Sequence, residues 1–283
     1  MRERPFTFGS GDGLMGVFTE PSPARDRRGA PTLLTWNVGT NHRVGPHRML
    51  VDLARDVAGR GFASIRFDLS GRGDSSARRD ASSEAERDLG DLREAMAVAA
   101  ARGGARVVVL GFCSSVDAAH QIALADERVV GACFIEGYAH RTRGFYARYP
   151  LRLLDPARWK RTLAHHVPTA ARRWPVVGDL ARIPVVVPGD DDEVYLREFP
   201  PPRALRRDYA AMVDRGVQLL FLYAGGDSSY NHRRQLYEFG CDSPHGDKIE
   251  VEFYRQADHT FFRVEDRARA VARIGAWMER RFS

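Results

Sequence analysis

The stretch Val107–His120, VVVLGFCSSVDAAH, runs from four apolar residues through a glycine into a cysteine followed by two serines. A continuous apolar run of this length, ended by a glycine, is typical of a buried strand, and the residues after Ser115 have helical composition. Small residues two before and two after a central position let a strand and a helix approach closely at a sharp turn. The stretch therefore predicts a strand–turn–helix unit with Cys113 at its tip.

Apolar segments alternate with amphipathic segments on both sides of this unit. An N-terminal hairpin is expected where RPFTF and LMGVFTEP flank the turn GSGDG. Further strands are expected at TLLTWN (32–37), at FASIRFDLSGRGDSS (62–76), where the strand runs into a glycine-rich loop, and at VVGACFIEG (129–137), VQLLFLYAGGD (217–227) and KIEVEFYRQADHTFF (248–262), with helices between and after them. Strands alternating with helices predict an α/β fold with a mostly parallel central sheet and helices on both faces.

The alternation is interrupted between about residues 138 and 216. This part of the chain is rich in arginine, proline and aromatic residues and has no clear succession of strand and helix. It predicts a mainly helical cap, or lid, inserted into a core formed by residues 1–137 and 217–283. The acidic run at 190–193 is expected to be a solvated loop of that insertion.

Composition limits the possible partners. The chain has 283 residues, is 43% hydrophobic and carries a formal charge of +6. Only two of its 43 basic residues are lysines, and its arginines are scattered rather than clustered with aromatics, which argues against nucleic-acid binding. No stretch has the pattern of a secretory leader or approaches the ~18 apolar residues of a membrane span. We therefore expect a soluble cytoplasmic protein.

The cysteines and the possible metal ligands of the sequence predict neither a disulfide framework nor a metal site. The three cysteines, Cys113, Cys133 and Cys241, are odd in number and widely spaced, which fits neither a disulfide framework nor a zinc pattern. No group of His, Cys or carboxylate residues has metal-ligand spacing in the sequence. The turn RFDLSGRGDSS lacks the spacing of nucleotide-binding loops, so its Asp68 and Asp74 are expected to fix turns. No metal and no cofactor is predicted.

Cys113 occupies the position of the nucleophile in the turn usually written GxSxG, the nucleophile elbow. In such folds an acid and then a histidine follow the nucleophile, each in a loop at the carboxyl end of a late strand. Asp227 lies at the end of the predicted strand 217–227, and His259 lies at the end of the next one. The predicted triad is Cys113, His259 and Asp227, with Glu136, at the end of the strand 129–137, as the alternative acid.

Other residues are expected to surround this triad. An oxyanion hole needs two backbone N–H groups, which we assign to Ser114 and to either Val38 or Gly39 in the loop after TLLTWN. Substrate-binding candidates lie in that same loop and in the insertion. They are Asn37, His42, Tyr138, Arg141, Tyr146 and Trp159.

These motifs together carry a resemblance. From Thr32 to about Val130 the chain resembles the α/β-hydrolase superfamily, and more narrowly the exosortase A system-associated hydrolases. That group similarly combines an Asn and a Gly after the oxyanion strand, an RVGP stretch, an RFDLSGxGDS turn and a cysteine in the elbow. The segment LLDPARWKRTL of the insertion is also similar. The resemblance implies an α/β-hydrolase fold with a cap and a Cys-His-Asp enzyme, with Ser115 replacing the commonest glycine.

A cysteine nucleophile widens the chemistry that the triad could perform. Its covalent intermediate is a thioester, which water, amines, thiols and carbon nucleophiles can attack. The first hypothesis is cleavage of an ester, thioester or lactone, with a small-molecule acyl substrate that could be delivered as a carrier-bound thioester. The second is an acyltransferase or cyclase that passes the acyl group from Cys113 to an amine, alcohol or carbon nucleophile. The third is a non-catalytic binding protein on the same scaffold.

Overall fold

The structure is a computed structural model of the chain. It describes residues 1–27, 29–39, 41–78, 83–148, 199–225, 229–241 and 246–283. The chain divides into two compact units, one formed by Met1–Thr142 with Phe199–Ser283 and the other by Arg143–Glu198. Of the second unit the described part is the helix α4 (Arg143–Arg148).

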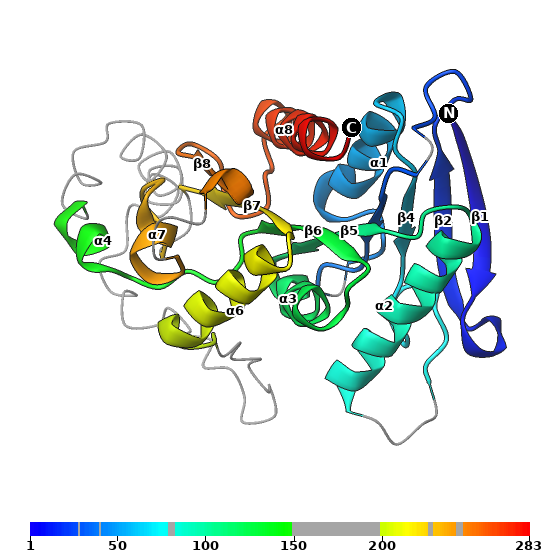
Figure 1. The fold of residues 1–283 in the computed structure, drawn as a ribbon, viewed down its shortest axis with the longest axis horizontal. Helices are drawn as coiled ribbons and strands as arrows, with labels where there is room; N and C mark the ends of the chain where they lie inside the picture. Colours follow the sequence, from blue (N-terminus) through cyan, green and yellow to red (C-terminus); the bar gives the residue numbers. More distant parts are fainter. Residues whose placement is uncertain (28, 40, 79–82, 149–198, 226–228, 242–245) are drawn as a thin grey trace, which may run out of the picture. The chain divides into compact units, whose positions relative to one another are not determined.

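The first unit is built on one eight-stranded sheet (Figure 1). Its strands, in chain order, are β1 (Arg2–Phe8), β2 (Leu14–Glu20), β3 (Thr32–Thr35), β4 (Ser64–Phe67), β5 (Val107–Phe112), β6 (Val129–Ile135), β7 (Gln218–Ala224) and β8 (Ile249–Tyr254). The spatial order is β1-β2-β4-β3-β5-β6-β7-β8. The six strands β4, β3, β5, β6, β7 and β8 are parallel, whereas β1 and β2 form the predicted antiparallel hairpin at one edge.

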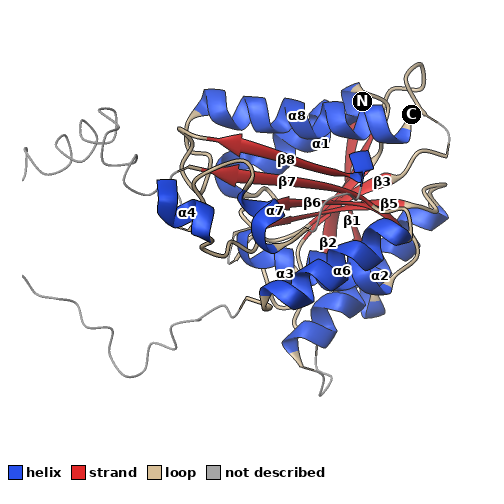
Figure 2. Cartoon of the chain, turned by 60° about the vertical axis from the view of Figure 1, so that its left-hand side comes forward, coloured by secondary structure: helices blue, strands red, loops and turns tan. Residues whose placement is uncertain are grey.

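Helices cover both faces of this sheet, as predicted (Figure 2). The helices α1 (Met49–Gly59) and α8 (Val264–Phe282) pack on one face, and α2 (Glu84–Ala101), α3 (Val116–Ala125) and α6 (Pro202–Asp214) on the other. Each face has its own buried apolar cluster. In α8 the buried residues Ala270, Ile274, Trp277 and Met278 recur at helical spacing, which explains why this segment folds as an amphipathic helix against the sheet.

The helix α6 lies inside the range predicted as insertion, but it belongs to the first unit. Its buried residues Leu205, Tyr209 and Met212 join the core cluster that also contains residues of α3 and β7. Most of the predicted cap, residues 149–198, lies outside the described residues. The short helix α7 (Gln235–Phe239) follows β7 and contacts α6.

None of the described helices combines the length and the apolar character that crossing a bilayer requires.

Candidate active site

The turn between β5 and α3 has the geometry that its small residues predict. Cys113 opens the single turn η3 (Cys113–Ser115) and has a positive φ of 53°, which is strained for any residue with a side chain. A Cβ added to Gly111 would lie 2.7 Å from Val116 Cα and 2.8 Å from the Ser115 carbonyl oxygen. Because that clash is with backbone, only glycine fits at this position. The turn thus presents the half-buried Cys113 side chain at the carboxyl end of the sheet.

Ser115 occupies the last position of the elbow, where glycine is commonest. Its hydroxyl accepts a hydrogen bond from the Phe112 N–H at 2.7 Å and donates one to the Phe112 carbonyl oxygen at 2.9 Å. The side chain is buried. It therefore stabilises the strained turn by bonding both main-chain groups of the residue before the nucleophile.

His259, in the loop after β8, lies beside a buried carboxylate. Its Nδ1 is 3.0 Å from Oε2 of Glu136, which directly follows β6. The other carboxylate oxygen, Oε1, accepts a hydrogen bond from the Ala224 N–H at the end of β7. The Glu136 side chain is only 2% exposed, whereas that of His259 is 42% exposed. A fixed, buried carboxylate thus holds one nitrogen of a ring that remains accessible.

The protonation of His259 depends on two neighbours. A hydrogen bond with the Cys113 side chain, followed by the bond with Glu136, raises the pKa of His259 to about 10, against the opposing effect of burial. Since Nδ1 faces Glu136, the other ring nitrogen, Nε2, is left for the sulfur. At neutral pH the imidazole is therefore protonated between two groups that favour its positive charge.

Asp227 is the first predicted acid, and Asp258 directly precedes His259 in the sequence. Asp227 lies outside the described residues. The Asp258 carboxylate accepts hydrogen bonds from the Thr260 N–H at 2.8 Å, the Thr260 hydroxyl at 2.7 Å and the Phe262 N–H at 3.0 Å. Asp258 thus shapes the loop that carries His259, whereas the carboxylate at the ring nitrogen Nδ1 is that of Glu136.

The loop after β3 meets the elbow at Gly39. Gly39 has a positive φ of 56°, and its N–H donates a hydrogen bond to Ser114 Oγ at 3.1 Å. Val38 is buried and forms an isolated bridge with Asn41. The residues that the sequence suggested for the oxyanion hole are therefore neighbours in space. The sequence analysis assigned only the backbone N–H of Ser114 to the oxyanion hole. No sequence pattern indicated that the Ser114 hydroxyl accepts the Gly39 N–H.

Asn37, predicted to bind substrate, anchors the loop after β3 through its side chain. Its side chain is fully buried, and its Nδ2 donates to the Asn41 carbonyl oxygen at 2.9 Å and to Asp68 Oδ1 at 2.8 Å. Its Oδ1 accepts from the Leu69 N–H at 2.6 Å. Because every one of these bonds is to the protein, the amide of Asn37 connects the loop after β3 to the turn after β4 and is not presented to a ligand.

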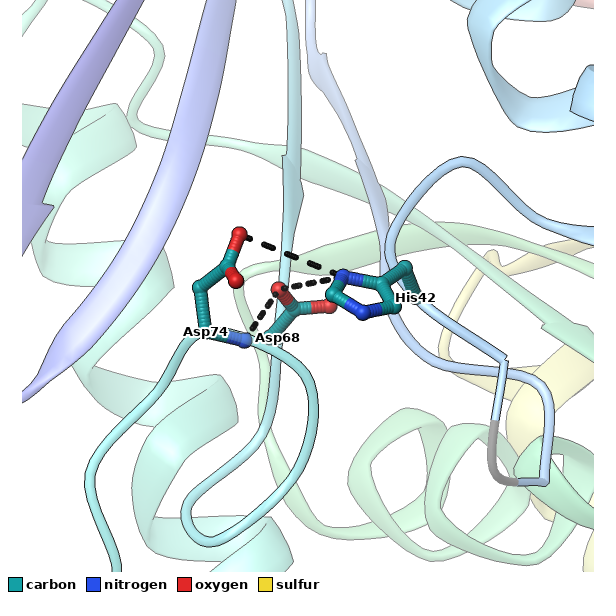
Figure 3. A group of neighbouring side chains, drawn as sticks. All are labelled: His42, Asp68 and Asp74. Carbon is teal, nitrogen blue, oxygen red and sulfur yellow. Dashed lines mark hydrogen bonds and ion pairs between the residues drawn. The ribbon is translucent and has the colours of Figure 1, made fainter.

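His42 lies over the same turn, beside Asp68 and Asp74 (Figure 3). Its Nδ1 is 3.8 Å from Asp68 Oδ2 and 3.9 Å from Asp74 Oδ2. Among the residues that the structure describes, these three are the group whose ligand atoms, all within 4.8 Å of one another, could hold a metal ion. The Arg43 guanidinium already pairs with both carboxylates. The Asp74 N–H also donates to Asp68 at 3.1 Å, so these aspartates fix turns, as predicted.

Four substrate-binding candidates remain, namely Tyr138, Arg141, Tyr146 and Trp159. Tyr138 is 3% exposed and packs its ring against His120, with centroids 5.4 Å apart, so it belongs to the core. Arg141 and Tyr146 are exposed, but Tyr146 belongs to the second unit. Trp159 lies outside the described residues.

Comparison with known proteins identifies the fold. No protein-family model and no curated protein matches the chain. Among solved structures, it is similar to the esterase domain of a Rhodothermus marinus protein, with 15% identity, a TM-score of 0.57 and 100% of both chains covered. It is also similar to an α/β serine hydrolase homologue from Coxiella burnetii, with 12% identity, a TM-score of 0.55 and coverage of 100% of this chain and 99% of that one.

A third similar structure is a cold-adapted esterase from an Arctic intertidal metagenomic library, with 13% identity and a TM-score of 0.54. The alignment covers 99% of this chain and 94% of that one. At these identities the likeness concerns the fold. Together with the mostly parallel eight-stranded sheet and its two helical layers, it shows that the chain has the α/β-hydrolase fold.

Proposed function

We propose that the protein is an enzyme that cleaves an ester, thioester or lactone through an acyl-Cys113 intermediate, with His259 as base and acid and Glu136 as the carboxylate that orients it. One observation carries the proposal. His259 bonds at the same time to the Cys113 side chain and to the buried Glu136 carboxylate. A nucleophile, a base within reach of it and an acid that orients the base are the parts that acyl transfer through a side chain requires.

Glu136 takes the place that the sequence analysis gave first to Asp227. Both of its oxygens are engaged, one by the Ala224 N–H and one by His259 Nδ1. A carboxylate fixed in this way keeps the proton of the neutral ring on Nδ1 and turns Nε2 towards the sulfur. The remaining carboxylate charge stabilises the imidazolium.

Acylation begins from the state in which the proton of the Cys113 thiol has already moved to His259. The thiolate attacks the substrate carbonyl carbon, so that a sulfur–carbon bond forms and the carbonyl electron pair moves onto oxygen. When the oxyanion collapses, the bond to the leaving oxygen or sulfur breaks, and His259 gives its proton to that leaving group. The acyl group is then held on Cys113 as a thioester, and the ring is neutral.

Deacylation uses the changed state of the ring. The largest cause of the raised His259 pKa is its bond with the Cys113 side chain, and acylation of the sulfur removes that partner. The neutral imidazole can then take a proton from water while the water oxygen attacks the thioester. Collapse breaks the sulfur–carbon bond and releases the acid, and Cys113 leaves as a thiolate beside the protonated ring.

Water is the acceptor that the similar structures favour, because two of the three are named esterases. Transfer to an amine, an alcohol or a carbon nucleophile uses the same intermediate and the same first step. The two reactions are separated by product analysis, with and without a candidate acceptor. A higher yield of the transferred product at constant acylation rate would identify the enzyme as a transferase.

The test of the proposal is labelling of the folded protein. On exposure to 4-nitrophenyl acetate, intact-protein mass spectrometry should show one acetyl group, and peptide mapping should place it on Cys113. Cys133 and Cys241 are both buried and serve as internal reference thiols. Cys113→Ala should abolish the adduct. An unlabelled wild-type protein that also releases no 4-nitrophenol, or acetyl groups on the reference thiols at the same rate, would contradict the mechanism and favour a binding protein.

A further inference from the structure

The Ser114 hydroxyl lies at the junction between the elbow and the loop after β3. Ser114 follows the nucleophile, and its Oγ accepts the Gly39 N–H at 3.1 Å. This bond uses the N–H of Gly39, which the sequence analysis offered, as an alternative to that of Val38, for the second oxyanion donor. Gly39 therefore points its N–H at a serine oxygen, and not at open space.

The proton of that hydroxyl has no partner in the described part of the chain. Two buried serines use both functions of their hydroxyls: Ser115 accepts from Phe112 N and donates to Phe112 O, and Ser75 accepts from Met15 N and donates to Asp68 O. Ser114 accepts one bond, and none to an acceptor is found among the described residues. Its side chain is only partly buried, so the O–H can reach a ligand.

We propose that the Ser114 hydroxyl is a side-chain donor to the oxyanion, oriented by the Gly39 N–H. The inference rests on the proposed function, because it concerns the oxyanion formed when Cys113 attacks a carbonyl. The amide fixes the oxygen of Ser114 and polarises its O–H, as happens in a chain of hydrogen bonds. The proton then points at the charge that develops beside the nucleophile, where a prearranged donor contributes most. The Gly39 N–H thus stabilises the oxyanion in part through the Ser114 hydroxyl.

The loop does not depend on Ser114 for its position. Asn37 bonds the loop to Asp68 and to the Asn41 carbonyl oxygen, and the Arg43 N–H donates to Asp68 at 2.7 Å. These bonds remain when the hydroxyl of Ser114 is removed. A loss of rate in a Ser114→Ala variant therefore reports a lost donor, and the same variant should keep the fold of the loop.

The experiment compares a reaction that forms an oxyanion with one that does not. Acetylation of Cys113 by 4-nitrophenyl acetate forms an oxyanion, whereas alkylation by iodoacetamide displaces iodide at a saturated carbon. We expect Ser114→Ala to slow the acetylation rate constant tenfold or more while the alkylation rate stays within about twofold. Ser114→Thr keeps the hydroxyl and should retain most of the acetylation rate. Ser10→Ala, an exposed serine of the β1–β2 turn, is the matched control.

The outcomes separate this inference from the proposed function. Wild-type acetylation of Cys113 with an unchanged rate in Ser114→Ala overturns the inference alone. Equal losses in both reactions also overturn it, because the substitution has then altered the thiol itself. If wild-type Cys113 is not acetylated at all, the proposed function fails and the inference fails with it. A donor hydroxyl is supported if Ser114→Ala loses the acetylation rate and Ser114→Thr retains it.

Discussion

Glu136 Oε2 lies 3.0 Å from His259 Nδ1, although 123 positions separate the two residues in the chain. Glu136 directly follows β6, and His259 lies in the loop after β8. β7 lies between these strands, and its last residue, Ala224, binds the other oxygen of the same carboxylate. The carboxyl ends of three neighbouring parallel strands thus build one site. Glu136 has a positive φ of 50°, a strained value that is common where a backbone aims a functional side chain.

Glu136→Gln should lower kcat by about 10²–10⁴-fold, because the neutral amide no longer stabilises the imidazolium or fixes its tautomer. The measurement is steady-state hydrolysis of 4-nitrophenyl acetate, with circular dichroism to confirm folding. Asp227→Asn is the matched comparison and should change kcat less than fivefold. A large loss in Asp227→Asn together with near-normal Glu136→Gln would assign the acid to Asp227.

The raised pKa of His259 predicts an unusual pH dependence for Cys113. The ring stays protonated up to about pH 10, so an imidazolium is present beside the sulfur across the neutral range. A positive neighbour favours the thiolate, the form that reacts with iodoacetamide. Alkylation of wild-type Cys113 should therefore remain fast down to pH 6.

His259→Gln removes this positive charge and should return the alkylation profile towards that of an ordinary thiol, with its midpoint at about pH 8.5. The rate at pH 6.5 should then fall by at least tenfold relative to wild type, while the rate at pH 10 changes little. Coinciding profiles for the two proteins would show that the ring does not govern the sulfur.

The elbow and the layered fold could be predicted from the sequence because both depend on local patterns. Small residues around Cys113 specify a tight turn whatever lies elsewhere, and the apolar runs on either side specify buried strands. The order of β6, β7 and β8 then brings the loops after them to one edge. His259 was predicted in this way, since the loop after the last strand of such a sheet lies at that edge.

The choice between two acids depends on information that the sequence does not contain. Glu136 and Asp227 follow neighbouring parallel strands, and which carboxylate reaches the ring depends on backbone angles such as the positive φ of Glu136. Asn37 and Ser114 show the same limit. Their side-chain bonds depend on how the loop after β3 turns at Gly39, and this turn follows from contacts with Asp68, 31 positions beyond Asn37.

Ser115→Ala tests whether the hydroxyl stabilises the elbow. The substitution leaves the buried Phe112 N–H without its acceptor, which should reduce the free energy of unfolding by about 1–3 kcal/mol. Urea denaturation followed by fluorescence gives this value. The exposed Ser10→Ala should change it by less than about 0.5 kcal/mol. Equal stability of Ser115→Ala and wild type would mean that another group satisfies Phe112.

Asn37→Ala should damage both the fold and the reaction, because Asn37 positions the loop that carries Gly39. The substitution leaves the Leu69 N–H and the Asn41 carbonyl oxygen without their partner and should cost about 2–4 kcal/mol of unfolding free energy. The surviving folded protein should acetylate Cys113 more slowly, while its alkylation by iodoacetamide is unchanged.

His42→Ala is the control for this loop, since the exposed His42 ring lies over the same aspartates without a short hydrogen bond to either. It should change the unfolding free energy by less than about 0.5 kcal/mol. If Asn37→Ala proved as stable as His42→Ala, the buried amide would not be the anchor of the loop. If instead His42→Ala raised KM at constant stability, the exposed ring would be a substrate contact, as the sequence suggested.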